Sequence, residues 1–192
     1  GGLARVSEET ATLTRALAAA AGCEAAGLVA GAGTDGAAAR LARYLPLVRR
    51  LEVPEAAGTA WAAAVAPAIV ALVEQERPAY LVVGATADGR DLAGALSALL
   101  GWGLLANVAS IAWSDGGPLA ERSAFGGRLV ATARFREGHG ILTPLANTVD
   151  PAPLAAPGRV ESASATARRT LPSARVVERV AETGAAAPIE EA

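Results

Sequence analysis

Residues 80–100, YLVVGATADGRDLAGALSALL, contain an apolar run, a turn with two glycines and an alanine- and leucine-rich helical repeat. The apolar run predicts a strand over residues 80–84 that helices cover on both faces. A helix is expected over residues 89–100, with Thr86 or Asp88 as its N-cap. The turn therefore joins the carboxyl end of a central strand to a helix N-terminus, where open α/β sheets bind ligands.

The residues of this turn leave two interpretations open. Gly84 and Gly89 permit a close backbone approach, and Thr86, Arg90 and the free amides of the helix could surround a phosphate. However, the segment GATADG is neither a GxGxxG fingerprint nor a Walker loop with its lysine, and two aspartates in the turn would repel an anion unless the arginine offsets them. On the residues alone, a structural corner is favoured over a nucleotide site.

Upstream of this turn, strand and helix patterns alternate. The expected elements are a helix over residues 7–21 with Ser7 as N-cap and Gly22 as its stop, a strand over 25–31, a helix capped by Thr34 and Asp35 that runs to about Tyr44, an outer strand over 47–53, and a helix over 59–76. Pro67 should kink or shorten that last helix, because proline removes a backbone donor and clashes with the preceding turn. The alternation predicts a parallel sheet with right-handed crossovers.

The uncharged residues 92–113 are long enough to be considered as a membrane span. Gly101, Gly103 and Asn107 interrupt this stretch, and its periodicity changes halfway. We therefore expect a helix, a glycine-rich turn and a buried strand over residues 107–114, without membrane insertion.

Beyond Asp115, short alternating runs separated by glycines predict antiparallel hairpins. Residues 128–136 and 140–144 are expected to pair across a turn at 137–140. A proline-rich linker follows at 150–158, two pieces at 159–167 and 174–182 could form edge strands, and the last ten residues have linker composition. The fold class that these patterns predict is α/β: a Rossmann-like three-layer sandwich with a mainly parallel sheet and an antiparallel C-terminal extension.

Composition and charge exclude several classes of function. The net charge of −2 and the pI of about 5.5 argue against a nucleic-acid partner. The one cysteine, Cys23, is expected to be a small buried hydrophobe in a reducing cytosol, and no signal peptide is visible. The one histidine, His139, has no second His or Cys to complete a metal site or a triad. We therefore expect no catalytic residues, no metal and no hydrolase. The Gly-Gly start without methionine suggests that the natural protein begins earlier.

Two segments resemble one known family. RPAYLVVGATADGRDLAGALSALLGWGLLANV (residues 77–108) and ERSAFGGRLVATA (residues 121–133) are similar to the N-terminal domain of the electron transfer flavoprotein alpha subunit, whose turn reads G-x-T-x-x-G-R-D-L-A. The resemblance implies the fold of the adenine nucleotide alpha-hydrolases. It also implies that residues 1–165 are the N-terminal α/β domain, and that residues 166–192 are a final strand and linker toward a FAD-binding domain that this chain lacks. The opening strand of the family is expected to lie outside the chain as well.

The function implied by this resemblance is that of a non-catalytic domain in a cytoplasmic bacterial electron carrier. The intact alpha subunit pairs with a beta subunit, holds FAD mainly through its second domain, and carries electrons from acyl-CoA or other dehydrogenases to the respiratory chain. In the beta subunit the equivalent loop holds AMP, whereas in alpha it generally holds no cofactor. Gly84, Thr86, Gly89 and Arg90 would then be a vestigial nucleotide loop, with Arg90 and Asp91 acting as clamps. The alternative is a stand-alone adenine-nucleotide-binding module of the same fold; an alpha-hydrolase enzyme lacks its Ser-Gly-Gly-x-Asp-Ser loop here.

Overall fold

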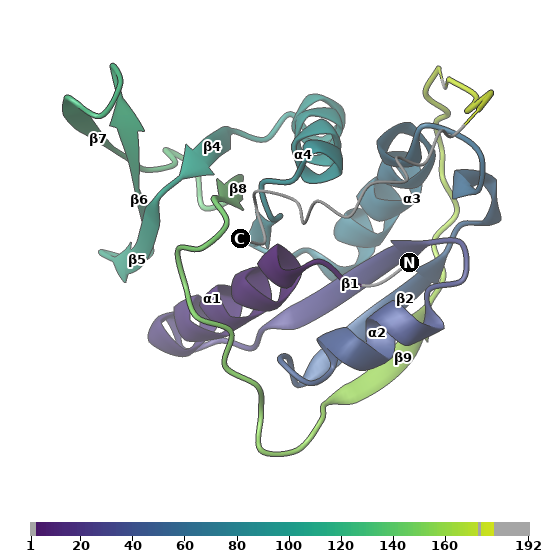
Figure 1. Cartoon of the computed structure of the whole chain (residues 1–192), viewed down its shortest axis with the longest axis horizontal. Coiled ribbons are helices and arrows are strands. Elements are labelled where there is room, and N and C mark those ends of the chain that lie inside the picture. Colours follow the sequence, from purple (N-terminus) through teal and green to yellow (C-terminus); the bar gives the residue numbers. More distant parts are fainter. Residues whose placement is uncertain (1–2, 173, 179–192) are drawn as a thin grey trace, which may run out of the picture.

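The computed structural model describes residues 3–172 and 174–178, and its strands form three sheets of three strands each (Figure 1). Two of the sheets are parallel. The first has the order β1 (Ala26–Gly31), β2 (Leu47–Glu52), β9 (Arg159–Ala163), and the second has the order β3 (Tyr80–Val82), β8 (Gly140–Pro144), β4 (Leu104–Val108). The third sheet is antiparallel, with the order β5 (Ser110–Ser114), β6 (Gly117–Ala124), β7 (Leu129–Ala133).

Four helices cover the parallel strands in two layers. α1 (Arg5–Ala21) and α2 (Asp35–Leu41) pack with Val48 of β2 into one apolar cluster. α3 (Trp61–Glu76) and α4 (Ala87–Leu100) pack with Leu51 of β2 and Ile141 of β8 into another. Val48 and Leu51 are three positions apart in β2, so they point to opposite faces of their strand. This arrangement confirms the predicted α/β class and its three layers.

The buried strand β8 connects the parallel part of the molecule to the antiparallel sheet. All five of its residues are buried, and it lies between β3 and β4. Ile141 faces the cluster of α3 and α4, whereas Leu142 packs with Val108 of β4 and Ala120 of β6. The antiparallel sheet therefore shares a hydrophobic core with the parallel sheets only around Ala120 of β6. In Figure 1 its far end projects away from the rest of the molecule.

The helix starts differ from the sequence predictions. Ser7 is not the N-cap of α1, since the helix begins at Arg5 and Ala4 precedes it without a side-chain cap. Thr59 does not open α3 either; its hydroxyl donates to the Glu55 carbonyl, and the helix begins at Trp61 after a short 3-10 turn, η1 (Pro54–Ala56). The error at Thr59 arose because a Thr can satisfy its hydroxyl locally without starting a helix.

Other helix predictions are confirmed only in part. Gly22 ends α1 in the left-handed conformation, as expected. α2 ends at Leu41 rather than near Tyr44, and Thr34 does not cap it with its side chain. Pro67 lies inside α3 without shortening it, because the helix continues to Glu76.

Two strands occupy other positions than predicted. β2 was expected at the outside, but it pairs with β1 and with β9 and is central in its sheet. β3 was expected to be central over residues 80–84, but it covers only Tyr80–Val82 and is an edge strand of the second sheet. β1 and β3 each pair with one strand, and the other edge of each has no strand partner among residues 3–172 and 174–178.

The predicted hairpin between residues 128–136 and 140–144 is wrong. β7 pairs with β6 instead, and β8 runs parallel to β3 and β4. The sequence predicts Gly140 in a turn, but a Cβ there would lie 2.2 Å from the ring of Phe135. Gly140 is therefore required by close packing, and the buried apolar sequence of β8 fits a strand covered on both sides.

The uncharged stretch at 92–113 forms a helix, a turn and strands. α4 ends at Leu100, and β4 begins at Leu104. The predicted strand over 107–114 is divided, because Asn107 adopts a positive φ of 53° and the pairing of β4 with β8 shifts register there. The backbone amide of Asn107 donates to the hydroxyl oxygen of the buried Thr143 at 3.0 Å. None of the helices within the described residues is long and apolar enough to cross a membrane.

The chain returns to the body after the proline-rich segment. β9 is an edge strand, as predicted, and pairs with β2. Of the second expected edge piece, at 174–182, the described part forms a single bridge between Arg175 and Thr59, and the Val176 amide donates to the Gly58 carbonyl at 2.9 Å. The rest of that piece and the linker-like end lie outside the described residues.

Candidate functional site

The turn between β3 and α4, residues 84–90 and here called the corner, brings together the four residues singled out from the sequence. Thr86 is the N-cap of α4, and its hydroxyl accepts a hydrogen bond from the Gly89 amide at 2.9 Å. The Ala85 amide donates to the Pro144 carbonyl at 3.0 Å, which ties the corner to the end of β8. The corner thus combines an N-cap with a strand-like contact, and Thr86 is confirmed as the cap.

Arg90 points back onto the corner that precedes it. Its guanidinium donates to the Ala85 carbonyl at 2.9 Å, and its amide donates to the Thr86 carbonyl as the helix starts. The Asp91 side chain makes no hydrogen bond or ion pair with any residue that the structure describes. Arg90 therefore acts as a clamp on the corner, whereas no contact supports that role for Asp91.

Both glycines of the corner lie in close contacts, Gly84 with side chains of α1 and Gly89 with backbone. A Cβ at Gly84 would lie 3.1 Å from Val6 and 3.2 Å from the hydroxyl oxygen of Thr10, so α1 covers the end of β3 at this point. A Cβ at Gly89 would lie 2.0 Å from the Gly84 carbonyl oxygen. The glycines thus let protein backbone and helix approach each other, which is one of the two uses that the sequence left open.

The electrostatics of the corner do not favour an anion. Asp88 lies in the first turn of α4, where its carboxylate interacts favourably with the helix dipole. The Gly89 amide donates to the Thr86 hydroxyl oxygen, and the Arg90 guanidinium donates to the Ala85 carbonyl. Binding of a nucleotide at Gly84, Thr86, Gly89 and Arg90 stays a prediction, and these contacts describe a turn that is closed by its own groups.

A second turn, between β1 and α2, was not singled out from the sequence. The Glu52 carboxylate, at the end of β2, accepts from the Gly33 amide at 2.6 Å and from the Thr34 hydroxyl at 3.0 Å. These hydrogen bonds, led by the one from Gly33, lower the pKa of Glu52 below its usual range. The signal that could have identified it is an acidic residue ending a strand that neighbours a Gly-Thr-Asp turn.

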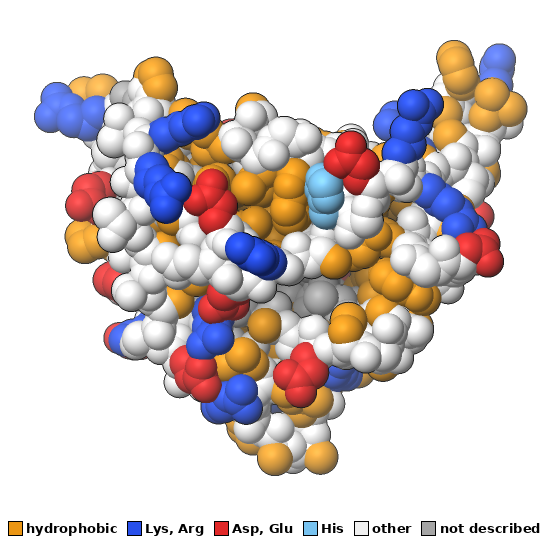
Figure 2. Space-filling view, turned by 180° about the vertical axis from the view of Figure 1, so that it is seen from behind, with side chains coloured by type: hydrophobic (Ala, Val, Ile, Leu, Met, Phe, Trp, Pro, Cys, Tyr) orange, Lys and Arg blue, Asp and Glu red, His pale blue; other side chains and the backbone are white. Residues whose placement is uncertain are grey.

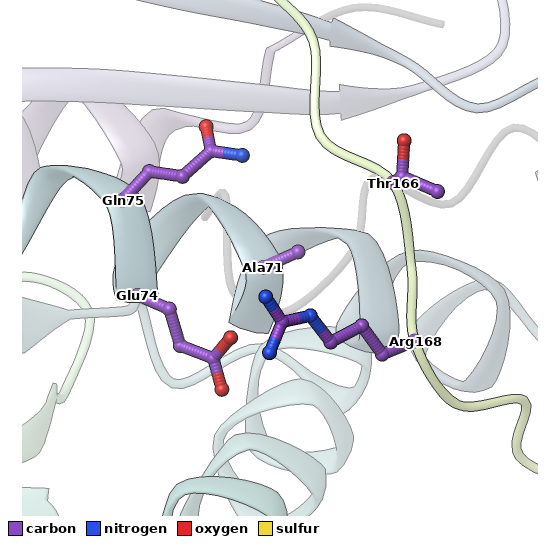
Figure 3. A pocket seen from close by; sticks show the side chains of 5 residues that line it. All are labelled: Ala71, Glu74, Gln75, Thr166 and Arg168. Carbon is purple, nitrogen blue, oxygen red and sulfur yellow. The ribbon is translucent and has the colours of Figure 1, made fainter.

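Two cavities of the structure are large enough to be compared with a cofactor. One, of about 250 Å³, lies between α3 and the segment that follows β9, and Figure 3 shows Thr166 and Arg168 of that segment opposite Ala71, Glu74 and Gln75. The other, of about 200 Å³, lies near Tyr80, Asp115 and Phe135. Sites for drug-sized ligands usually measure roughly 300–1,000 Å³. FAD is larger than either cavity, so neither cavity fits it.

The single histidine and cysteine do not form a reactive site. The His139 ring lies 4.8 Å from that of Trp102, and its Nε2 is 3.0 Å from the Glu137 carboxylate. Cys23 was expected to be buried, but it is exposed just after the end of α1. Within residues 3–172 and 174–178, no group of three or more His, Cys, Asp or Glu side chains is arranged to hold a metal ion.

The fold and the corner together define a Rossmann-like three-layer α/β domain, in which a short strand, a glycine-containing turn and a helix capped by Thr86 follow one another. Comparison with known families identifies the particular group. The model of the electron transfer flavoprotein domain matches residues 1–170, and the chain therefore belongs to this family, as an N-terminal domain of the alpha-subunit type.

Curated relatives agree with this assignment. The chain is 33% identical over 168 residues to the electron transfer flavoprotein subunit alpha of Mycobacterium tuberculosis (strain ATCC 25618 / H37Rv), covering 82% of the chain and 48% of the relative. It is 31% identical over 157 residues to the same subunit of Mycobacterium leprae (80% and 46%). The match to protein FixB of Rhizobium meliloti is 38% over 94 residues (48% and 26%). The chain spans about half the length of the curated alpha subunits that it matches.

Proposed function

We propose that the chain serves as the N-terminal domain of an alpha subunit in a heterodimeric, FAD-containing electron carrier. In this role it assembles with a beta subunit, and the heterodimer transfers electrons from acyl-CoA or other dehydrogenases to the respiratory chain in a bacterial cytoplasm. The observation that carries the proposal is the family match over residues 1–170, which includes the corner. The printed names of the relatives, subunits of electron transfer flavoproteins, support it.

The domain contributes structure and no chemistry of its own. The corner is closed by Thr86 and Arg90, and neither cavity fits FAD. The flavin supplies the electron-transfer chemistry when it is bound, and we assign its ligands to residues outside this chain. Residues 1–165 are the domain proper in this proposal, and residues 166–192 lead toward the FAD-binding domain.

The proposal is tested by the colour of the purified chain. The chain expressed alone is incubated with FAD and then passed through a gel-filtration column without FAD. Its fractions are expected to be colourless. Full-length alpha subunit mixed with beta subunit is the matched positive control and should retain the yellow flavin absorption band. A flavin band that stays with the chain alone through gel filtration would contradict the assignment of the ligands.

The alternative, a stand-alone adenine-nucleotide-binding module, makes a different prediction for the corner. A ligand that binds only the folded state raises stability by mass action, so AMP or ATP would raise the Tm of such a module. We expect no shift with either nucleotide. A saturable shift that disappears in Arg90→Ala, with Arg77→Ala as the control at an exposed arginine outside the corner, would establish the alternative instead.

A further inference from the structure

The segment that follows β9 stays on the domain beyond the end of that strand. The strap, defined here as residues 164–172 and 174–178, passes along α3 and ends beside the loop that precedes this helix (Figure 1). In the reversed view of Figure 2 this end of the molecule is at the upper left and shows basic side chains. The strap contains no helix and no strand beyond a single bridge. Contacts with the rest of the domain therefore hold it in place, rather than its own secondary structure.

Apolar side chains make the first kind of contact. The inward and outward alternation of β9 continues past the end of the strand, because Ala163 and Ala165 are half-buried and their neighbours are exposed. Ala165 and, farther along the strap, Leu171 pack against the apolar cluster of α3 and α4. Because this packing removes apolar surface from water, both contacts favour the docked position of the strap.

A short antiparallel pairing with the loop before α3 makes the second kind of contact. The Ala60 amide donates to the Ala174 carbonyl at 2.8 Å, and the Val176 amide donates to the Gly58 carbonyl at 2.9 Å. An antiparallel bridge lies between these two hydrogen bonds. This arrangement is the first step of an antiparallel ladder, in which the end of the strap is the second strand.

The middle of the strap bows over a cavity. Residues 166–170 are all exposed, and the cavity of about 250 Å³ separates Thr166 and Arg168 from α3. Figure 3 shows Arg168 of the strap opposite Glu74 of the helix. Neither side chain forms an ion pair with a residue that the structure describes. Exposed opposite charges that do not touch contribute little to stability, so the contacts on either side of the bow hold the strap.

The docked strap is close in free energy to a released one. Ordering the backbone of the exposed bow costs conformational entropy, and this part of the strap buries no side chain in return. Two hydrogen bonds and the packing of Ala165 and Leu171 oppose that cost. Segments with few buried contacts and exposed hydrogen bonds open locally while the rest of a domain stays folded. The strap has both properties, so it is expected to open without unfolding of the α/β body.

We infer that the strap is a releasable latch. Its pairing with residues 58–60 holds the chain at the N-terminal end of α3, and loss of this pairing frees the chain from the end of β9 onward. Once released, residues 164–178 can span up to about 50 Å, at ~3.3–3.6 Å per residue. One consequence rests on the proposed function: the latched strap fixes where the segment toward the FAD-binding domain leaves the α/β body, and release extends its reach.

The test measures the distance between two spin labels on the chain by double electron–electron resonance. Cys23 is the single cysteine and is exposed, so it takes one label. Glu178→Cys, at the exposed end of the strap, takes the other. A latched strap predicts a distance distribution with one narrow main peak. A broad distribution without such a peak in the chain that carries only these labels would overturn the inference.

Ala60→Pro removes one hydrogen bond of the pairing and keeps the start of α3. The φ of Ala60 is −64°, which proline adopts, and proline is tolerated at the N-terminal end of a helix. The ratio of released to latched strap should rise roughly three- to tenfold, as expected for one lost hydrogen bond, and appear as a broad component of the distribution. Ala4→Pro is the matched control: Ala4 precedes α1 with a φ of −69°, and proline there should leave the distribution unchanged.

A second pair of variants tests the apolar contact. Leu171→Ala removes most of the side chain that packs on the cluster of α3 and α4, so the released fraction should again rise several-fold. Val177→Ala is the control within the strap, because this side chain is 88% exposed, and the distribution should not change. Far-UV circular dichroism that matches the original chain shows that the body of each variant is folded.

Each outcome decides between named alternatives. A narrow peak that stays narrow in both Ala60→Pro and Leu171→Ala would show that these contacts do not hold the strap, and the latch would be wrong. A narrow peak that is lost on dilution would assign the docking to a strap exchanged between two copies and would also overturn the inference. The experiment uses neither FAD nor beta subunit, so the latch can fail while the proposed function stands. A flavin band on the chain alone contradicts the proposed function without affecting the latch.

Discussion

The corner at residues 84–90 and the tip at residues 125–130 are both glycine-containing turns, and they use their residues in opposite ways. In the corner, Gly89 lies against the Gly84 carbonyl, Thr86 caps the helix, and Arg90 donates to Ala85. In the tip, which joins β6 to β7, the Phe125 ring is held outward with 79% of its surface exposed. A glycine turn that satisfies its own polar groups is a structural element, whereas one that leaves apolar groups exposed contributes little to the fold.

The position of each turn in the fold explains this difference. The corner lies at the end of β3, where α1 covers it and the Pro144 carbonyl of β8 holds it. The tip lies beyond the last core contact of β6, which is made by Ala120. At the root of the same sheet, Arg134 pairs with Asp115 at 2.9 Å and holds the start of the β6 hairpin. The antiparallel sheet is therefore anchored at one end and free at the other.

The largest expected effect on stability is at Gly89. Gly89→Ala places a Cβ 2.0 Å from a backbone oxygen, so the corner must shift, and we expect the free energy of unfolding to fall by about 1–3 kcal/mol, as in other overpacked sites. Urea denaturation with an unchanged m-value measures this loss.

Gly94→Ala is the matched control in the same helix. Nothing lies within 4 Å of a Cβ at Gly94, so alanine should stabilise α4 by up to about 1 kcal/mol through its higher helix propensity. Equal effects at the two glycines would show that Gly89 is not constrained by the corner.

Removal of the cap should have a smaller effect. Thr86→Ala leaves the Gly89 amide without its acceptor and is expected to cost about 1 kcal/mol, a usual value for an N-cap. Thr86→Ser keeps the hydroxyl and should retain most of the stability in the same urea experiment. If serine and alanine destabilise the chain equally, the hydroxyl is not the group that holds the corner.

At the tip the expected effect on stability has the opposite sign. Phe125→Gly removes an exposed side chain from a left-handed position and should raise the free energy of unfolding by between zero and about 1 kcal/mol. The chain's other phenylalanine is the control: Phe135 lies 5.8 Å from the Tyr80 ring and packs against Gly140, so Phe135→Ala should destabilise. A loss of stability in Phe125→Gly would mean that the ring supports the fold.

The turn held by Glu52 adds a pH-dependent case to the comparison. Hydrogen bonds from Gly33 and Thr34 lower the pKa of this carboxyl in the folded chain, so its stabilising effect is present above the pKa of an unfolded glutamate and is lost as the pH falls through the lowered value. The stability difference between the original chain and Glu52→Gln should therefore shrink below about pH 4.

Thermal denaturation of both chains across this pH range gives the difference directly. Thr86→Ala, whose turn is closed by neutral groups, is the control and should show a difference that does not change with the ionisation of Glu52. A difference between the original chain and Glu52→Gln that stays constant with pH would show that the carboxylate does not hold its turn.

Much of the fold could be predicted from the sequence because the strand and helix signals are local. The alternation up to Leu100, the capping role of Thr86 and the end of α1 at Gly22 all depend on neighbouring residues. The position of each strand in its sheet depends on partners far along the chain. β8 was expected to form a hairpin, yet its partners are β3 and β4.

The candidate site shows the same limit. The four residues of the corner were found from the sequence, but whether their glycines admit a ligand or a helix depended on α1, which contacts Gly84 through Val6. Exposure of the tip could not be read from its alternating apolar pattern, since the same pattern also describes a strand buried on one face. The positive φ of Phe125 is likewise a property of the hairpin and leaves no signal in residue type.

Hydrogen–deuterium exchange of the chain, with and without AMP, tests the central claim most directly, because it compares the two turns in one experiment. We predict that the amides of Gly89 and Arg90, which are hydrogen-bonded to Thr86, exchange at least about tenfold more slowly than those of the tip, and that AMP changes neither rate. Amides of residues 84–90 that exchange as fast as those of the tip, and become protected only when AMP is added, would contradict the account.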